Sequence, residues 1–279
     1  MADDIIIDVI GVHKAFGTKV VLAGADLRIR RGESMVIIGG SGTGKSVMIK
    51  HMIGLLTPDK GKVLVDGIEV GTLNEEDLNN LRRKFGMLFQ GAALFDSMTI
   101  GENVGFAIKE HTNLSRADRE KKVTEKLNLV GLFNVENLKP AELSGGMKKR
   151  AGLARAIAMD PEIILYDEPT TGLDPVMCDQ INNLIVDLQN KIGATAVTIT
   201  HDMVSANKIA DRIAMLYKGQ FVSVGTPDEV FSSTVPEVAE FCYIGKVIRN
   251  TEAIQGRQTA PASGDPAAKA DISNNQAGM

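Results

Sequence analysis

The chain has 279 residues, of which 44% are hydrophobic and 24% charged, a composition typical of a folded protein that buries a substantial core. Its formal net charge of −4 provides no overall positive field, which disfavours a nucleic-acid partner. Its two cysteines, Cys178 and Cys242, lack the spacing of a metal site or a disulfide framework, which favours a reducing compartment.

The N-terminus lacks the basic and long apolar segments of a secretory signal. No uninterrupted apolar run approaches the roughly 20 residues that a membrane helix needs. We therefore expect a cytosolic or peripheral protein.

The first part of the chain predicts strands. Residues 5–9 are rich in β-branched side chains and residues 20–29 alternate apolar with polar, which favours early antiparallel strands. Residues 35–38 form a continuous apolar run, as in a strand buried on both faces. A glycine-rich turn and a helical pattern follow this run.

Two further apolar runs, residues 163–166 and 195–199, predict buried strands. Helical patterns such as residues 177–189 neighbour them. This alternation indicates an α/β core with a parallel sheet.

The middle of the chain, between about residues 74 and 158, is more helical. Apolar residues recur at helical spacing in residues 75–83, 100–110 and 116–130. We interpret this region as a helical insertion, with a helical subdomain at about residues 91–158.

From residue 256 onward the sequence is rich in small and polar residues and has no aromatic side chain. Such a segment buries too little apolar surface to offset the entropy of ordering. The expected organisation is one domain over residues 1–250 and a disordered tail over residues 251–279.

A phosphate-binding loop follows the run at residues 35–38. It matches the pattern G-x-x-x-x-G-K-[ST], with glycines that let backbone NH groups converge on phosphate oxygens ahead of a helix N-terminus. Lys45 is expected to reach the β- and γ-phosphates, and Ser46 to ligate Mg²⁺. The loop comprises Gly39, Gly40, Ser41, Gly42, Thr43, Gly44, Lys45 and Ser46.

Two adjacent carboxylates, Asp167 and Glu168, follow the apolar run at residues 163–166. Successive side chains on a strand point in opposite directions, so the two carboxylates can have different roles. Asp167 suits the water shell of a metal, and Glu168 suits a base for the attacking water. Paired carboxylates after a strand can also form a solvated turn, but the upstream phosphate-binding loop favours the catalytic interpretation.

Residues 143–147, LSGGM, closely resemble the signature sequence of ABC ATPases and stand just upstream of the carboxylates, as in that family. Ser144 with the NH groups of Gly145 and Gly146 would begin a helix and could bind an anion. The resemblance implies that this anion is the γ-phosphate of ATP held by a second copy of the chain, in a head-to-tail homodimer. Met147 departs from the glutamine that many family members carry.

Other positions also resemble family motifs. Gln90 resembles the glutamine that contacts magnesium, and Gly172, Leu173 and Asp174 resemble the loop that faces the partner subunit. His201 resembles the switch histidine that contacts the γ-phosphate, although a histidine at a strand end can be structural.

Phe16 resembles the aromatic residue that stacks on adenine, and its alternative is a core phenylalanine. The implied fold is α/β, a P-loop NTPase core of ABC type with an antiparallel β subdomain and a helical insertion. The implied cofactors are ATP and Mg²⁺, the metal held by Ser46, by Gln90 and, through water, by Asp167. Glu168, His201 and Lys45 are the expected catalytic residues.

Within the family, three segments resemble the ATPases of Mce-type lipid transporters, of which the Mla phospholipid system of Gram-negative bacteria is one. They are residues 94–99, 110–112 and 143–150. This resemblance implies an ATPase at the cytoplasmic face of the inner membrane that helps maintain outer-membrane lipid asymmetry. It implies as partners a permease dimer, a periplasmic Mce-domain protein and a small STAS-domain protein.

Three points stay open from the sequence. An amino-acid or other small-solute importer shares every catalytic motif. The basic run at residues 148–150 is either a solvated helix face or a partner contact. The apolar cluster within residues 235–248 is expected to pack on its own or on the neighbouring subunit.

A soluble ABC ATPase of translation or DNA repair is disfavoured, because neither a second cassette nor a basic face is visible.

Overall fold

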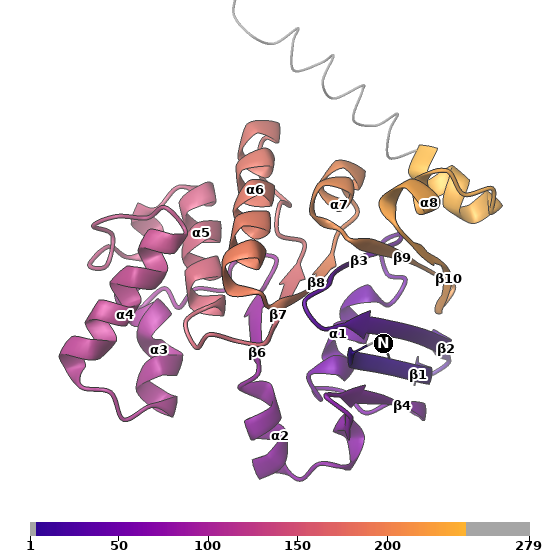
Figure 1. The fold of residues 1–279 in the computed structure, drawn as a ribbon, viewed down its shortest axis with the longest axis horizontal. Coiled ribbons are helices and arrows are strands. Elements are labelled where there is room, and N and C mark those ends of the chain that lie inside the picture. Colours follow the sequence, from indigo (N-terminus) through magenta and orange to yellow (C-terminus); the bar gives the residue numbers. More distant parts are fainter. Residues whose placement is uncertain (1–3, 244–279) are drawn as a thin grey trace, which may run out of the picture.

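Two β-sheets and the helices around them make up residues 4–243, the part of the chain that the computed structural model describes (Figure 1). One sheet has six strands in the order β10-β9-β3-β8-β7-β6, and the other has four in the order β2-β1-β4-β5. The strands are β1 (Ile5–Phe16), β2 (Lys19–Arg30), β3 (Ser34–Ile38), β4 (Lys60–Val65), β5 (Ile68–Glu69), β6 (Phe85–Leu88), β7 (Ile163–Asp167), β8 (Thr195–Ile199), β9 (Arg212–Tyr217) and β10 (Gln220–Gly225). The helices are α1 (Lys45–Met52), α2 (Glu75–Arg82), α3 (Ile100–His111), α4 (Arg116–Leu129), α5 (Gly145–Ala156), α6 (Pro175–Ile192), α7 (Met203–Ile209) and α8 (Pro227–Phe231), with the 3-10 helices η1 (Val70–Thr72) and η2 (Pro140–Glu142).

The six-stranded sheet is parallel except at one edge. Strand β3 pairs in parallel with β8 and β9, β7 pairs in parallel with β6 and β8, and only β10 is antiparallel to its neighbour. Every residue of β3 and β8 is buried. The predicted parallel sheet and its three buried strands are therefore confirmed.

Alternate residues of the central strands enter two different cores. Met35 and Ile37 of β3 pack in the core shared with the four-stranded sheet and α1. Val36 and Ile38 pack on the other face, in the core that holds buried residues of α3 to α7. Both faces of the sheet are covered, which explains why its strands are continuous apolar runs.

The predicted antiparallel pair is confirmed and is longer than expected. Strands β1 and β2 each span 12 residues and stay paired through several register shifts. Arg31, just after β2, joins the two sheets by ion pairs to Asp66, which follows β4, and to Glu162, which precedes β7. Polar and apolar contacts together fix the four-stranded sheet to the core.

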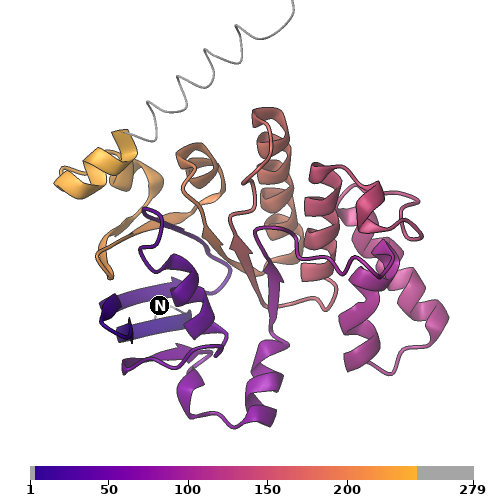
Figure 2. The same cartoon turned by 180° about the vertical axis from the view of Figure 1, so that it is seen from behind.

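The helical region differs from the prediction in one respect. Helices α3, α4 and α5 lie together at one end of the molecule, whereas α2 lies apart from them, beyond β6 (Figure 1). Figure 2 shows the same separation from behind. Residues 75–83 are helical as predicted, but they are not part of one continuous helical insertion, because β6 enters the six-stranded sheet between α2 and α3.

A further helical segment, residues 236–243, ends the described part of the chain. Its Val238 and Cys242 are buried in the core that also holds residues of α6 and α7, so this part of the predicted C-terminal cluster packs on its own subunit. The tail predicted for residues 251–279 lies outside the described residues. Within residues 4–243, no helix is both long enough and apolar enough to cross a bilayer.

Candidate functional site

The phosphate-binding loop connects the carboxyl end of β3 to α1, as the sequence predicts. Its backbone requires glycine at both ends. Gly39 has φ +150°, and a Cβ there would lie 2.4 Å from the carbonyl oxygen of Leu216. Gly44, the residue before α1, has φ +108°, and a Cβ would lie 2.9 Å from Val21 Cγ1. The tight turn at the N-terminus of a helix is the geometry that binds phosphate.

A cavity of about 490 Å³ opens in front of this loop. It brings together the carboxyl ends of β3, β7 and β8, where ligands bind in parallel sheets. Its lining residues are Gly40, Ser41, Gly42, Lys45, Ser46, Gln90, Asp167, Glu168, Ile199, His201 and Phe241. Seven of the fourteen residues predicted for nucleotide and magnesium binding therefore line one cavity, together with the predicted catalytic residues Glu168 and His201.

Lys45, the first residue of α1, places its ammonium in the loop. Its Nζ donates hydrogen bonds to the carbonyl oxygens of Gly39 at 2.8 Å and Gly40 at 2.9 Å, and the residue is 8% exposed. Burial lowers the pKa of Lys45, and the charges of Glu168 and Asp167 partly oppose this shift. A desolvated cation beside convergent NH groups is suited to bind phosphate oxygens.

Asp167 ends β7 and is half-buried. Burial and the neighbouring Glu168 raise the pKa of Asp167, while Lys45, Lys50 and Lys149 act in the opposite direction. A divalent cation would relieve the repulsion between the two carboxylates. Ser46, Gln90 and Asp167 all line the cavity, and their hydroxyl, amide and carboxylate groups are the kind of oxygen ligand that Mg²⁺ prefers. The donor set thus fits the metal that the sequence predicts.

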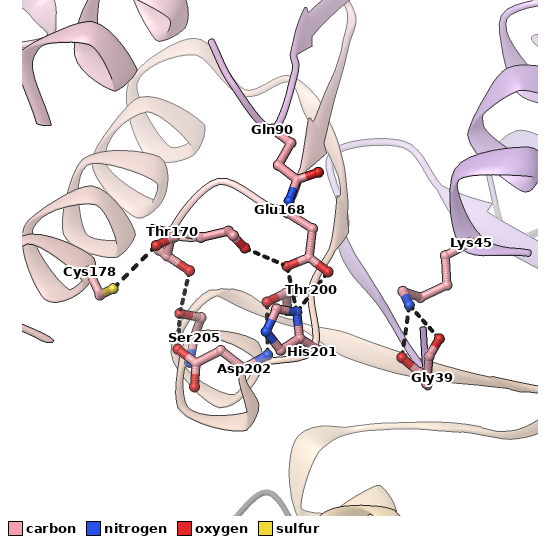
Figure 3. A network of polar contacts seen from close by, with 12 residues as sticks. Gly39, Lys45, Gln90, Glu168, Thr170, Cys178, Thr200, His201, Asp202 and Ser205 are labelled. Atoms are coloured by element: carbon pink, nitrogen blue, oxygen red, sulfur yellow. Dashed lines mark hydrogen bonds and ion pairs between the residues drawn. The ribbon is translucent and has the colours of Figure 1, made fainter. Parts of the chain in front are cut away.

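Glu168 is held in an unusual backbone conformation with φ +50°. Its carboxylate accepts a hydrogen bond from His201 Nδ1 at 2.9 Å (Figure 3). It accepts another from Thr171 Oγ1 at 3.0 Å. A left-handed conformation at a non-glycine residue costs energy and often marks a functional position. These contacts fix the orientation of the carboxylate of a residue that lines the cavity.

A buried polar network links the loop after Glu168 to the loop that carries His201 (Figure 3). Ser205 Oγ donates to Asp202 at 2.6 Å and lies 3.4 Å from Thr170 Oγ1. Asn182 of α6 donates to the same Ser205 oxygen at 2.8 Å. Asp202 in turn accepts from the first backbone NH groups of α7, so the residue beside His201 is fixed from two sides.

The signature residues lie outside this cavity's lining. Ser144 is exposed at the start of α5, where its side chain accepts a hydrogen bond from the Met147 NH, and Gly145 is exposed beside it. Asp174 likewise caps α6 by accepting from Val176 and Met177. Ser144, Gly145 and Asp174 are exposed and are available to a ligand bound elsewhere, whereas Gly146, the third predicted signature residue, is buried against Met177.

Not every predicted nucleotide contact lines the cavity. Thr43 donates to the Gly40 carbonyl at 2.9 Å and so stabilises the loop itself. Phe16 ends β1 with 48% of its surface exposed, with the Lys14 ammonium 5.7 Å from its ring centroid. An exposed ring is free to stack on a base, so adenine stacking by Phe16 stays a prediction.

For two residues at the site, the structure shows a position that the sequence did not predict. Lys149 is neither on a solvated face nor available to a partner, because it is 5% exposed and its Nζ donates to the carbonyl oxygens of Gln90 and Glu168. Phe241, expected only to pack against a subunit, lines the cavity. The sequence showed a basic run around Lys149 and an apolar cluster around Phe241. Neither pattern indicated that Lys149 contacts the catalytic loops or that Phe241 lines the cavity.

Comparison with known proteins shows the family. Residues 22–171 match the ABC transporter family. The chain is 43% identical over 235 residues to a probable ribonucleotide transport ATP-binding protein of Mycobacterium leprae, covering 84% of this chain and 68% of that protein. It is 42% identical over 255 residues to protein TRIGALACTOSYLDIACYLGLYCEROL 3 of Arabidopsis thaliana, covering 85% and 73%. The alignments span only about two thirds of the mycobacterial proteins, 66% in Mycobacterium tuberculosis.

Importers and solved structures are also similar. A methionine import ATP-binding protein of Carboxydothermus hydrogenoformans is 45% identical over 205 residues, covering 74% of this chain and 60% of that protein. The dimeric ATP-binding cassette MJ0796, bound to ADP and phosphate, matches with a TM-score of 0.72 at 34% identity, over 79% of this chain and 98% of that one. The ABC transporter subunit cbiO1 of Clostridium perfringens matches with a TM-score of 0.77 at 29% identity, over 92% and 100%. This chain belongs to the ABC transporter family as an ATP-binding and ATP-hydrolysing subunit with the P-loop NTPase fold.

Proposed function

We propose that the chain powers a transporter that moves phospholipids between the inner and outer membranes of a Gram-negative cell. One observation carries the choice of cargo: residues 94–99, 110–112 and 143–150 together resemble the ATPases of Mce-type lipid transporters. The Arabidopsis relative, 42% identical, supports it because that protein bears the name of a glycolipid. The catalytic site supports ATP hydrolysis as the energy source of transport, but its residues do not distinguish one cargo from another.

The cavity supports a specific assignment of roles in hydrolysis. Lys45 and the loop NH groups would bind the β- and γ-phosphates, and Ser46, Gln90 and, through water, Asp167 would hold magnesium, which would neutralise phosphate charge. Glu168 accepts a proton as the water oxygen bonds to the γ-phosphorus and the bond from that phosphorus to the ADP oxygen breaks. His201 keeps the carboxylate aligned.

The position of the signature residues supports a dimer in which each copy completes the other's site. Ser144 and Gly145 are exposed at the N-terminus of α5, outside the cavity lined by their own subunit. A second copy would bring these donors to the γ-phosphate, with two equivalent sites about a twofold axis. The similar cassette MJ0796 is a dimer with ADP and phosphate.

A rigid aromatic surface supports contact with a permease at the cytoplasmic face of the inner membrane. The rings of Phe95 and Phe106 lie 5.4 Å apart and are 45% and 40% exposed. Beneath them, buried Asn103 bonds to both the NH and the carbonyl of Phe95, and Arg155 donates to Ala93. Exposed aromatics on a fixed backbone are suited to dock a helix of a membrane subunit. An Mce-domain protein and a STAS-domain protein complete the proposed complex.

The competing function is an importer of an amino acid or another small solute. The methionine import relative, 45% identical over 205 residues, favours it. Affinity purification of the tagged chain from gently solubilised membranes, with an untagged strain as control, tests the choice by mass spectrometry of proteins and lipids. We expect a permease, an Mce-domain protein and enriched phospholipid; a permease with a solute-binding protein and no enriched lipid would overturn the lipid assignment.

A further inference from the structure

Lys149 is a buried cation whose acceptors are two backbone carbonyls. It lies in α5, in the second turn after Ser144, and only 5% of its surface is exposed. Its Nζ donates to the carbonyl oxygen of Gln90 and, at 3.3 Å, to that of Glu168. Among residues 4–243, no carboxylate forms an ion pair with it. Burying an ammonium costs free energy of solvation, so the presence of Lys149 at a buried position calls for an explanation.

The two acceptors belong to the loops that carry catalytic side chains. Gln90 follows β6 and Glu168 follows β7, and these strands are parallel neighbours with Leu88 opposite Tyr166. The side chains of both Gln90 and Glu168 line the nucleotide cavity. One ammonium therefore fixes the backbones from which two functional side chains project.

The bond to Glu168 is significant because of that residue's backbone. Glu168 has φ +50°, and its NH donates to the Ile199 carbonyl at 2.9 Å. With Lys149 on its carbonyl, the residue is held at both ends in a conformation that an unconstrained glutamate rarely adopts. Hydrogen bonds from an ammonium are roughly twice as strong as neutral ones, which suits this task.

The position of Lys149 also connects the two halves of the proposed dimeric site. The same helix begins at Gly145, with Ser144 as its cap, and both residues are exposed at the position where the proposed second copy would bring its nucleotide. A shift of α5 would therefore be transmitted through one side chain to the loops of Gln90 and Glu168.

We propose that Lys149 is a positioning residue for ATP hydrolysis, which ties the helix bearing the signature residues to the backbones of Gln90 and Glu168. This inference concerns the ATPase reaction and holds for any cargo. Its distinguishing consequence is a loss of turnover without a matching loss of ATP binding, since Lys149 does not line the cavity.

The test compares Lys149→Met with Lys148→Met in the full chain assembled with its membrane subunits. Both substitutions remove one ammonium from α5, but Lys148 is half-buried and lies outside the cavity and the catalytic loops. We expect Lys149→Met to lower kcat by about 10- to 100-fold while the ATP dissociation constant changes by less than about threefold, the effect of losing charge-assisted bonds that position a catalytic group. Lys148→Met should keep kcat within about twofold of the original chain.

Lys149→Gln is the second variant, and it tests the positioning role if Lys149→Met does not fold. Its amide is shorter and uncharged, so it should restore part of the turnover and leave kcat at least about threefold below the original. A kcat within about twofold of the original in a folded variant, or a fall in kcat that only parallels weaker ATP binding, would overturn the proposal. A lowered melting temperature with unchanged kcat per folded molecule would overturn it as well.

Discussion

The Nδ1 atom of His201 lies 2.9 Å from the carboxylate of Glu168, although the residues are 33 positions apart (Figure 3). The parallel pairing of β7 with β8 brings their ends together, because Asp167 lies opposite Ile199. Thr171 donates to the same carboxylate at 3.0 Å. The orientation of the proposed base is therefore set by two side chains from different loops.

Replacing His201 with Ala should lower kcat by about 10- to 100-fold, the cost of losing one hydrogen bond to a charged group. Thr171→Val removes the other contact to the carboxylate, leaves the histidine in place and should have a smaller effect. Steady-state phosphate release at saturating ATP measures both. If Thr171→Val were the more damaging change, the histidine would not be the principal partner of Glu168.

The Glu168→Gln variant should bind ATP with an affinity within about threefold of the original chain and turn over at least about 100-fold more slowly, because an amide cannot accept the proton of the attacking water. Equilibrium binding of a fluorescent nucleotide and phosphate release measure the two quantities. Glu162→Gln is the control, since Glu162 is an exposed carboxylate that pairs with Arg31 far from the cavity. Near-normal hydrolysis by Glu168→Gln would remove Glu168 from the role of base.

Phe95→Asp should uncouple transport from hydrolysis. A charge in the aromatic pair of Phe95 and Phe106 would disrupt docking of an apolar helix, whereas the nucleotide cavity would be untouched. Cargo transport by the assembled complex should fall at least about tenfold, while the isolated chain hydrolyses ATP at its original rate. Phe133→Asp is a matched control, because Phe133 is 64% exposed and is not part of that pair. Equal transport by the two variants would contradict the docking role.

Asp160 provides a stability test in the helical region. Its carboxylate pairs with Lys122 and with Lys126, whose side chain is 6% exposed. Asp160→Asn leaves a buried ammonium unpaired and should lower the free energy of unfolding by about 1–2 kcal/mol, less than for a fully buried pair because Asp160 is half exposed. Asparagine tolerates the local φ of +52°, so no backbone strain is added.

The pH dependence of this pair follows from the pKa of Asp160. Burial raises that pKa, but hydrogen bonds from Lys122 and Lys126 outweigh it and bring it below its usual value of 3.8. The stabilisation is therefore complete above pH 3.8 and is lost as the pH falls through the lowered pKa. Urea unfolding should show a difference between the original and Asp160→Asn that is constant near neutrality and shrinks in acid. Glu120→Gln, which breaks an exposed pair with Arg116, should lower the free energy of unfolding less than Asp160→Asn does.

The sequence predicted the parts of the fold whose signals are local. The phosphate-binding loop, the strands β3, β7 and β8, and the helices α3 and α4 each combine a strong periodicity with a clear boundary. Strand β6 was missed because it has only four residues and contains Gly86, which suggests a turn. That glycine is required by tertiary packing, since a Cβ there would lie 2.1 Å from the Ala156 carbonyl oxygen.

The candidate site likewise contains residues that sequence motifs predicted and residues whose position only tertiary packing determines. The phosphate-binding motif predicted Lys45, the carboxylates after an apolar run predicted Glu168, and resemblance to the family predicted His201; all three line the cavity. Motif spacing could not distinguish Lys149 from its neighbour Lys148, because only the packing of α5 against the loops after β6 and β7 buries one and leaves the other partly exposed. Residues that act through the backbone of others carry no sequence signal of their own.

The most direct test of the account is ATP-dependent lipid transfer by the purified transporter in proteoliposomes containing a fluorescent phospholipid, with this chain as its ATPase. We expect MgATP to drive phospholipid out of the vesicles with the original chain and not with Glu168→Gln. A complex that hydrolyses ATP normally but moves no phospholipid, while an amino acid crosses the membrane in step with hydrolysis, would contradict the phospholipid assignment and leave the ATPase site as described.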